Sequence, residues 1–463
     1  MTMQDIPSRV DVLSETIALS TYGNTKNIII TAIDVKGPFD LEACKKAAQI
    51  AYKNFPELMS RIEETRLWGR HYLVWKPRFD LPLPITLTDL PHSERSGSLL
   101  NDIMTVLRPR LDREWNLFQE NAVEFHVIQL SDEHRILACV CHHVAADAGA
   151  ASEFGKQFLM HYHEIITGNM PDWANEGHAI SSSRKRPVRS HKNSWKDAIV
   201  NSHRGVMQIF EKPVLPVGRG KPTDLSEHFA KKILSEEQSD WIVMSASQSG
   251  VSLVDALTAS TNLVIDEWNA ERDVAPGLLT TAMTVNTRGR FSSFETPNNS
   301  SVIFFKSLPH ERKDPTSFVR LLARTRMRHF REHKDLSAMH NVRRMIQSLR
   351  FFPFRLRCRI VNFMLNRHRF SIAITLLGAV WPKIEKGKMT ANTSITRSAD
   401  LTVEEIHGIG YKLHSGTRLL LIAYTFRNRL NLILHGAGTL FSREETEAFL
   451  DLIVNKIQGG RRE

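Results

Sequence analysis

The alternation of apolar and polar positions in the first half of the chain predicts a mixture of strands and helices. Residues 28–35 alternate as a strand does, a Gly-Pro pair breaks the pattern, and Asp40 precedes a segment with apolar residues at helical spacing. Residues 122–130 and 135–142 are two further strand-like runs with a short polar turn between them. This arrangement predicts an antiparallel hairpin. Residues 147–166, which follow it, have the composition of a helix, with Asp147 positioned to cap its start.

The second half of the chain repeats the same kinds of signal. Patterns with capping-box spacing begin at Ser235, Ser252 and Ser442, each ahead of apolar residues at helical spacing. Strand-like runs at 418–426 and 430–438 precede the last of these patterns. Both halves are therefore predicted to be α/β.

A change of composition divides the chain into two parts. Residues 176–225 are rich in Pro, Gly, Ser and basic residues, which is typical of a linker or a long crossover. A chain of 463 residues is too long for one ordinary core. We therefore expect an N-terminal domain over residues 1–175 and a C-terminal domain over residues 226–463.

Composition and charge narrow the class of protein. Apolar residues make up 42% of the chain and charged residues 24%, as in soluble globular proteins, and no run long enough to span a bilayer lacks charge. The N-terminus has no secretory signal pattern, so a cytoplasmic location is expected. The four cysteines fit no zinc spacing and are interpreted as core residues. The net charge of +11 favours an acidic protein, a phosphorylated cofactor or anionic lipid as partner; nucleic acid is disfavoured because its binding motifs are missing.

The stretch Cys139–Ala150, CVCHHVAADAGA, contains the strongest candidate for chemistry. Neighbours on a strand face opposite sides, so one of His142 and His143 can be anchored in the interior while the other faces a cleft. A neutral imidazole can take a proton from a hydroxyl or an amine near neutral pH. A metal site is disfavoured, because the two histidines and Asp147 lack the spacing of helical zinc ligands.

This stretch resembles the His-His-x-x-x-Asp-Gly motif of the CoA-dependent acyltransferase superfamily, which includes chloramphenicol acetyltransferase, plant acyltransferases and condensation domains of nonribosomal peptide synthetases. Residues 37–62, 283–290 and 296–301 and the last strand and helix resemble condensation-domain segments in the same order. Ala148 replaces the glycine of the motif, and Gly149 follows it. The Asp-Phe-Gly-Trp-Gly motif of the plant branch is absent.

The resemblance implies two chloramphenicol-acetyltransferase-like α/β sandwich domains that form a pseudo-dimer with a tunnel between them. It also implies a monomeric acyltransferase that moves an acyl group from a CoA or acyl-carrier-protein thioester to a hydroxyl or amine. In that scheme His143 is the general base, and His142 and Asp147 are structural. Arg288 is the expected partner of Asp147. The thioester drives the reaction, so acyl-CoA or an acyl-phosphopantetheine carrier protein is a co-substrate and no bound cofactor or metal is expected.

The resemblance also makes Gly149 and Asn286 candidates for substrate contact.

Two basic segments suggest further partners. Arg184 and Arg186 lie in a stretch that is either a solvated loop or a docking site for an acidic carrier protein or for CoA phosphates. Residues 341–370 hold eight arginines and no acidic residue among many apolar side chains. This segment either packs on the protein with its arginines directed outward or contacts an anionic membrane surface.

Two alternatives to an acyltransferase therefore stay open. One is a catalytically silent condensation-like domain that docks a carrier protein. The other is a protein that binds a lipid or a membrane surface, peripheral to the membrane and without chemistry. Transfer of an acyl group from a thioester would separate the first reading from both alternatives.

Overall fold

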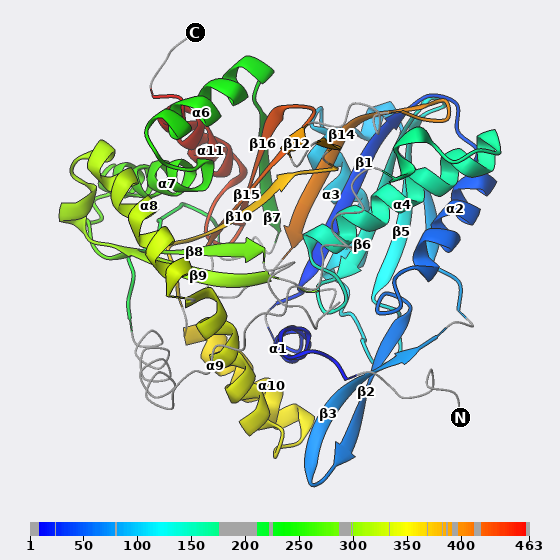
Figure 1. The fold of residues 1–463 in the computed structure, drawn as a ribbon, viewed down its shortest axis with the longest axis horizontal. Coiled ribbons are helices and arrows are strands. Elements are labelled where there is room, and N and C mark those ends of the chain that lie inside the picture. The colour runs from blue at the N-terminus through cyan, green and yellow to red at the C-terminus, as the bar shows by residue number, and fades with distance from the viewer. Residues whose placement is uncertain are drawn as a thin grey trace.

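The computed structural model contains two lobes, each built on a six-stranded sheet (Figure 1). The structure describes residues 9–23, 25–78, 81–175, 211–221, 226–286, 298, 300–332, 334–367, 369–381, 383–385, 388–390, 397–411 and 418–459. The mixed α/β fold class predicted from the sequence is confirmed.

The first sheet has the strand order β13–β14–β1–β6–β5–β4. In that order the strands span Arg397–Ser398, Leu401–Tyr411, Ile28–Lys36, His134–His142, Val123–Ser131 and Ile85–Asp89. Strands β4 and β5 are parallel, and all other neighbours are antiparallel. The predicted hairpin is thus confirmed as β5 and β6. Strands β13 and β14 come from residues beyond the predicted linker but pair in the first sheet.

Two helices cover one face of the first sheet, α2 (Leu41–Lys53) and α4 (Ala148–Thr167) (Figure 1). Asp40 caps α2 by accepting a hydrogen bond from the Ala43 backbone N–H, as the sequence predicts. The same lobe contains α3 (Leu99–Asp112) and the hairpin of β2 (Ser60–Leu67) and β3 (Arg70–Pro77).

The second sheet has the strand order β7–β16–β15–β10–β8–β9. In that order the strands span Glu227–Ile233, Arg429–Ala437, Leu419–Phe426, Ile372–Ala379, Leu279–Asn286 and Ser300–Ser307. Strand β10 pairs in parallel with β15 and β8, and the other neighbours are antiparallel. A short hairpin, β11 (Lys383–Glu385) and β12 (Lys388–Thr390), stands apart from both sheets.

Four helices accompany the second sheet. They are α6 (Glu236–Gln248), α7 (Leu253–Ala270), α8 (Pro315–Arg331) and α11 (Arg443–Ile457). The predicted capping boxes at Ser235, Ser252 and Ser442 are all present, at the starts of α6, α7 and α11. Single turns of 3₁₀ helix span His92–Glu94, Asp172–Asn175 and Pro309–Arg312.

Three further helices lie together below the two sheets in the view of Figure 1. They are α1 (Val12–Thr21), α9 (Lys334–Leu349) and α10 (Phe354–Arg367). A small apolar cluster that includes Leu19, Ile346 and Val361 joins α1 to the other two.

The larger apolar core lies mainly in the first lobe and includes side chains of β15 and β16 such as Ile422 and Ile433, whereas a second core lies within the second lobe. Cys139 and Cys141 lie in the first core with their Sγ atoms 3.2 Å apart, and all four cysteines are buried and unbonded, as the sequence predicts. Among the described helices, none has the length and apolar character that crossing a bilayer requires. The domain bounds at residues 175 and 226 stay a prediction.

Candidate active site

The two adjacent histidines lie where β6 ends and the chain turns into α4 (Figure 1). His142 is the last residue of β6 and pairs with Ile28 of β1. Its backbone N–H donates to the Ala122 carbonyl at 2.8 Å, and the backbone N–H of His143 donates to the Asn27 carbonyl at 2.7 Å. The paired strands therefore hold the backbone of both histidines.

His142 is fully buried and has a defined tautomer. Its Nδ1 accepts a hydrogen bond from the Val144 backbone N–H at 3.1 Å, so the ring proton is on Nε2. Nε2 lies 3.1 Å from the hydroxyl of Thr21, which already donates its own proton to the Ile17 carbonyl and so accepts here. Burial, with smaller effects of His143 and Arg110, lowers the pKa of His142 to about 3. This ring is a neutral structural group.

His143 is partly buried and contacts Asn298, which precedes β9 in the second lobe. The Nδ2 of Asn298 donates to the carbonyl oxygens of His143 at 2.7 Å and Val144 at 3.0 Å, and to the Ser14 hydroxyl at 2.8 Å. Carbonyl oxygens only accept, so this end of the amide must be the nitrogen. The amide oxygen therefore faces His143 Nδ1, 3.1 Å away.

This contact defines the protonation of the His143 ring. Because the amide oxygen of Asn298 only accepts, Nδ1 of His143 must donate and therefore carries the proton. In the neutral ring Nε2 then has a free lone pair. Burial lowers the pKa of His143, and the Asp147 carboxylate and the hydrogen bonds to the ring partly oppose that shift. The ring is thus a neutral base at physiological pH.

Asp147 caps the helix that follows the histidines. Its Oδ1 accepts a hydrogen bond from the Ala150 backbone N–H at 2.9 Å, and the side chain is buried. A carboxylate here is favourable because the first turn of α4 has unpaired N–H groups. The predicted cap is confirmed; the predicted pairing with Arg288 is not tested, because Arg288 lies outside the described residues.

The structure describes two of the remaining predicted site residues. Gly149 lies in the first turn of α4, close to the histidine turn. Asn286 ends β8, where its backbone is opposite Ser300. Arg184 and Arg186 lie outside the described residues, as Arg288 does.

Sequence reasoning missed three side chains that hold the site, Asn298, Ser14 and Thr21. Asn298 falls in the segment 296–301 that resembles a condensation-domain turn. That resemblance was the only signal for it, and it carried no information about a contact with His143. Ser14 and Thr21 are ordinary helix residues with no sequence signal for this role.

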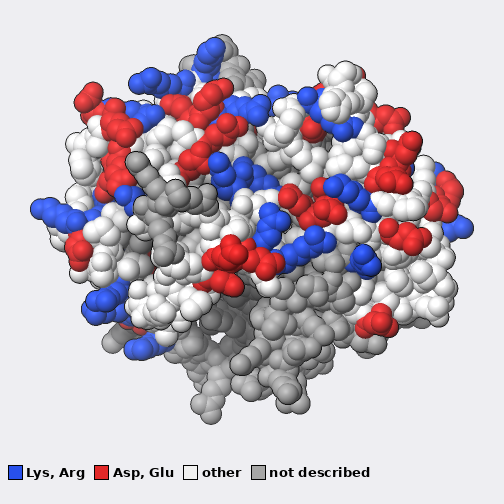
Figure 2. All heavy atoms as spheres, turned by 90° about the horizontal axis from the view of Figure 1, so that it is seen from above, with Lys and Arg blue, Asp and Glu red and all other residues white. Residues whose placement is uncertain are grey.

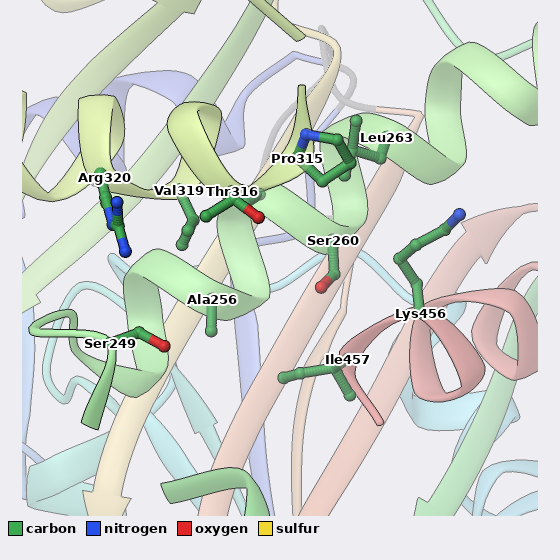
Figure 3. A pocket seen from close by; sticks show the side chains of 11 residues that line it. Ser249, Ala256, Ser260, Leu263, Pro315, Thr316, Val319, Arg320, Lys456 and Ile457 are labelled. Atoms are coloured by element: carbon green, nitrogen blue, oxygen red, sulfur yellow. The ribbon is translucent and has the colours of Figure 1, made fainter. Parts of the chain in front are cut away.

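The described part of the chain contains no cluster of three or more side chains suited to hold a metal ion. A pocket of about 240 Å³ opens between α7, α8 and α11, lined by residues such as Ala256, Val319 and Ile457 (Figure 3). A second pocket lies beside α8 and is lined by four of its arginines. Neither of these two pockets includes the histidines.

Comparison with known proteins supports the fold. No family model and no curated protein sequence matches this chain. Among solved structures, the first condensation domain of the CDA synthetase has a TM-score of 0.65 at 13% identity, with 98% of this chain and 96% of that chain covered. A mutant starter condensation domain of the rhizomide synthetase RzmA, in complex with C8-CoA and Leu-SNAC, has a TM-score of 0.63 at 11% identity, with 99% and 95% covered.

The X-domain from teicoplanin biosynthesis is also similar, with a TM-score of 0.56 at 13% identity and 99% and 97% of the two chains covered. The chain therefore has the two-lobed fold of condensation domains.

Proposed function

We propose that this protein is an acyltransferase that moves an acyl group from a CoA or acyl-carrier-protein thioester to a hydroxyl or amine acceptor. The observation that carries the proposal is the tautomer of His143. Asn298 holds the proton on Nδ1, so Nε2 is the nitrogen that can accept a proton from the acceptor.

In the proposed reaction His143 acts first as a base and then as an acid. The acceptor O–H or N–H donates to Nε2, and the acceptor atom bonds to the thioester carbonyl carbon as its proton passes to Nε2. The tetrahedral intermediate then collapses, the C–S bond breaks, and the leaving sulfur takes the proton from Nε2. The proton and the electron pairs balance without a bound cofactor, metal or redox partner.

Two neighbouring groups favour the transient imidazolium. The carboxylate of Asp147 raises the pKa of His143, and the amide oxygen of Asn298 accepts from the charged ring as it does from the neutral one. Asp147 also caps α4 and so holds the turn that carries the base. In this proposal Asp147 and Asn298 are positioning residues, Arg288 pairs with Asp147, and the tunnel between the lobes brings donor and acceptor together.

An acyl-transfer assay tests the proposal. Acyl-CoA thioesters of several chain lengths and acyl-phosphopantetheine carrier protein are offered with hydroxyl and amine acceptors, and products are identified by intact mass. His143→Ala should lower the rate by about 100- to 10,000-fold. His92→Ala, which changes an exposed histidine of the first lobe, should leave it unchanged.

Two results would overturn the proposal. Absence of transfer by the wild-type protein from every thioester, with retained binding of the carrier protein, would favour a silent docking domain. Transfer by His143→Ala at the wild-type rate would exclude His143 as the base.

A further inference from the structure

Two chain turns that are far apart in sequence meet at one edge of the molecule (Figure 1). One is the tip of the β2–β3 hairpin, and the other is the turn between α9 and α10. The backbone N–H of His71 donates to the Arg350 carbonyl at 2.7 Å, and the Arg70 guanidinium carbon lies 4.7 Å from the centre of the Phe351 ring. The two turns and the outer face of α10 therefore form one surface, here named the aromatic–arginine edge.

Large apolar side chains are exposed along this edge. Trp68 is 90% exposed, and Phe351 and Phe363 are each 58% exposed. The edge also exposes Leu67, Phe352 and Leu356. An exposed apolar cluster of this kind indicates a binding surface more often than a folding requirement.

The hairpin tip holds its tryptophan in an unfavourable conformation. Trp68 and Gly69 have φ values of +53° and +73°, so both central residues of the two-residue turn are left-handed. Such turns favour Asn-Gly, and a bulky residue at the first position is strained. Folding gives no reason for an indole here, whereas indole rings are favoured at the boundary between water and lipid.

The charge of the edge is positive. Arg355, Arg359 and Arg367 are exposed on α10, where their spacing places them beside Phe363 on the outer face of the helix. None of these three arginines forms an ion pair with a residue that the structure describes. The Arg367 guanidinium carbon lies 4.8 Å from the centre of the Phe363 ring. Basic and aromatic groups thus share one helix face.

The carboxylates at the base of the hairpin are already paired. Glu63 lies 2.6 Å from Arg61 and 3.0 Å from Lys76, and Glu64 lies 2.9 Å from Arg357. These pairs neutralise the acidic groups next to the edge. The exposed arginines of α10, together with Arg70 of the hairpin tip, therefore make the edge positive.

We propose that the aromatic–arginine edge binds an anionic membrane surface. Trp68 and Phe351 enter the headgroup region, and Arg355 and Arg359 pair with lipid phosphates. Apolar side chains at projecting tips with arginines beside them fit a lipid interface, where aromatic insertion and attraction to anionic headgroups act together. The inference is independent of the proposed acyl transfer, since it concerns binding alone.

Vesicle flotation with the full chain tests the inference. The probe is vesicles of phosphatidylcholine alone and of phosphatidylcholine mixed with phosphatidylserine. The wild-type protein should bind the anionic vesicles much more strongly than the neutral ones, and less strongly at high salt. Arg355→Gln with Arg359→Gln should lower the partition coefficient about 25-fold, at about fivefold for each arginine. Trp68→Ser and Phe351→Ser should each lower it about tenfold.

Matched control variants distinguish binding by the edge from nonspecific binding by any exposed apolar or charged side chain. Met244→Ser on α6 removes an apolar side chain that is also 58% exposed, on the side of the molecule away from the edge. In Figure 2, which views the molecule from that side, basic and acidic side chains are interspersed. Lys46→Gln with Lys53→Gln on α2 removes the same charge as the double arginine variant. Both controls should bind as the wild type does, and thermal unfolding verifies that every variant is folded.

Three results would overturn the inference. The first is no binding of the wild-type protein to anionic vesicles. The second is an equal loss of binding in the control variants, which would mean that net charge or exposed apolar area alone is responsible. The third is self-association that Trp68→Ser abolishes while vesicle binding is unchanged, which would make the edge a contact between copies of this chain.

Discussion

Removing the Asn298 side chain should release the proton of His143 from Nδ1. Asn298→Ala deletes the amide oxygen that accepts from His143 Nδ1 and the amide nitrogen that donates to the carbonyls of His143 and Val144. A neutral histidine whose Nδ1 has lost its acceptor can place its proton on either nitrogen. Molecules with the proton on Nε2 have no base directed at the acceptor.

The structure gives the size of the effect. A hydrogen bond lost from a buried group changes the relative free energy of the two tautomers by about 1 to 3 kcal/mol. At about 1.4 kcal/mol per tenfold, turnover should fall by roughly 10- to 100-fold. Asn298 is also 3% exposed and donates to two carbonyls and a hydroxyl. The free energy of unfolding should therefore fall by about 2 to 4 kcal/mol.

Nitrogen NMR of histidine-labelled protein measures the tautomer without any substrate. Long-range ¹H–¹⁵N spectra should show His143 protonated at Nδ1 in the wild-type protein, with His143→Ala assigning the signals, and protonated largely at Nε2 in Asn298→Ala. The acidic limb of the kcat/KM profile should also move to lower pH, since the contact with Asn298 raises the pKa of His143.

Thr21→Val provides the matched control. It removes the hydrogen bond between Thr21 and Nε2 of His142, and it should reduce stability without changing the NMR spectrum of His143. A wild-type His143 protonated at Nε2, or an unchanged tautomer in Asn298→Ala, would refute the reasoning.

Three other predictions concern His142, Asp147 and the proposed donor-docking segment. His142→Ala should reduce the free energy of unfolding by about 1 to 3 kcal/mol for each partner left unpaired, as denaturant unfolding measures. In the acyl-transfer assay its loss of turnover should be much smaller than that of His143→Ala. A large loss of turnover with unchanged stability would contradict the structural role of His142. Asp147→Asn preserves the helix cap but removes a charge that raises the pKa of His143, so the acidic limb of the kcat/KM profile should move to lower pH. If the activity losses of Asp147→Asn and Arg288→Ala add in the double variant, these two residues do not interact. Arg184→Glu should raise the KM for the thioester donor more at low salt than at high salt, and equal values at both would remove the docking role.

Local signals in the sequence predicted much of the frame of the site. The strand that ends at His142, the turn after it and the cap at Asp147 all depend on residues within a few positions of one another. The same holds for the capping box at Ser235. These hydrogen bonds join residues that are only a few positions apart, so residue types and their spacing identify them.

Contacts between segments that are distant in the chain have no such signal in the sequence. Asn298 and His143 are 155 positions apart, and the hydrogen bond between them depends on how the lobes meet. Strand β14 joins the first sheet although in the chain it lies between β10 and β15, which are neighbours in the second sheet. Sequence patterns predict that a segment is a strand, but they do not predict its partner.

The basic segment 341–370 shows a different limit. The sequence pattern predicts only that its arginines, as one group, either point outward or contact a membrane. In the structure Arg350 and Arg357 turn inward, to the fully buried Glu15 of α1, whereas Arg355 and Arg359 face solvent. Periodicity alone does not separate these sets, because Glu15, the carboxylate that both inward arginines share, is on a helix more than 300 residues away.

Helix α1 connects the aromatic–arginine edge to the histidines. Thr21 contacts His142, Ser14 contacts Asn298, and Glu15 pairs with the two inward arginines of the α9–α10 pair. Hydrogen bonds need a limited range of distances and weaken steeply when the donor angle is poor, so a shift of α1 would weaken the support of both histidines. Because breaking a buried ion pair is strongly destabilising, Glu15 couples any displacement of α9 and α10 to α1. A surface bound at the edge would therefore lie one helix away from the proposed base.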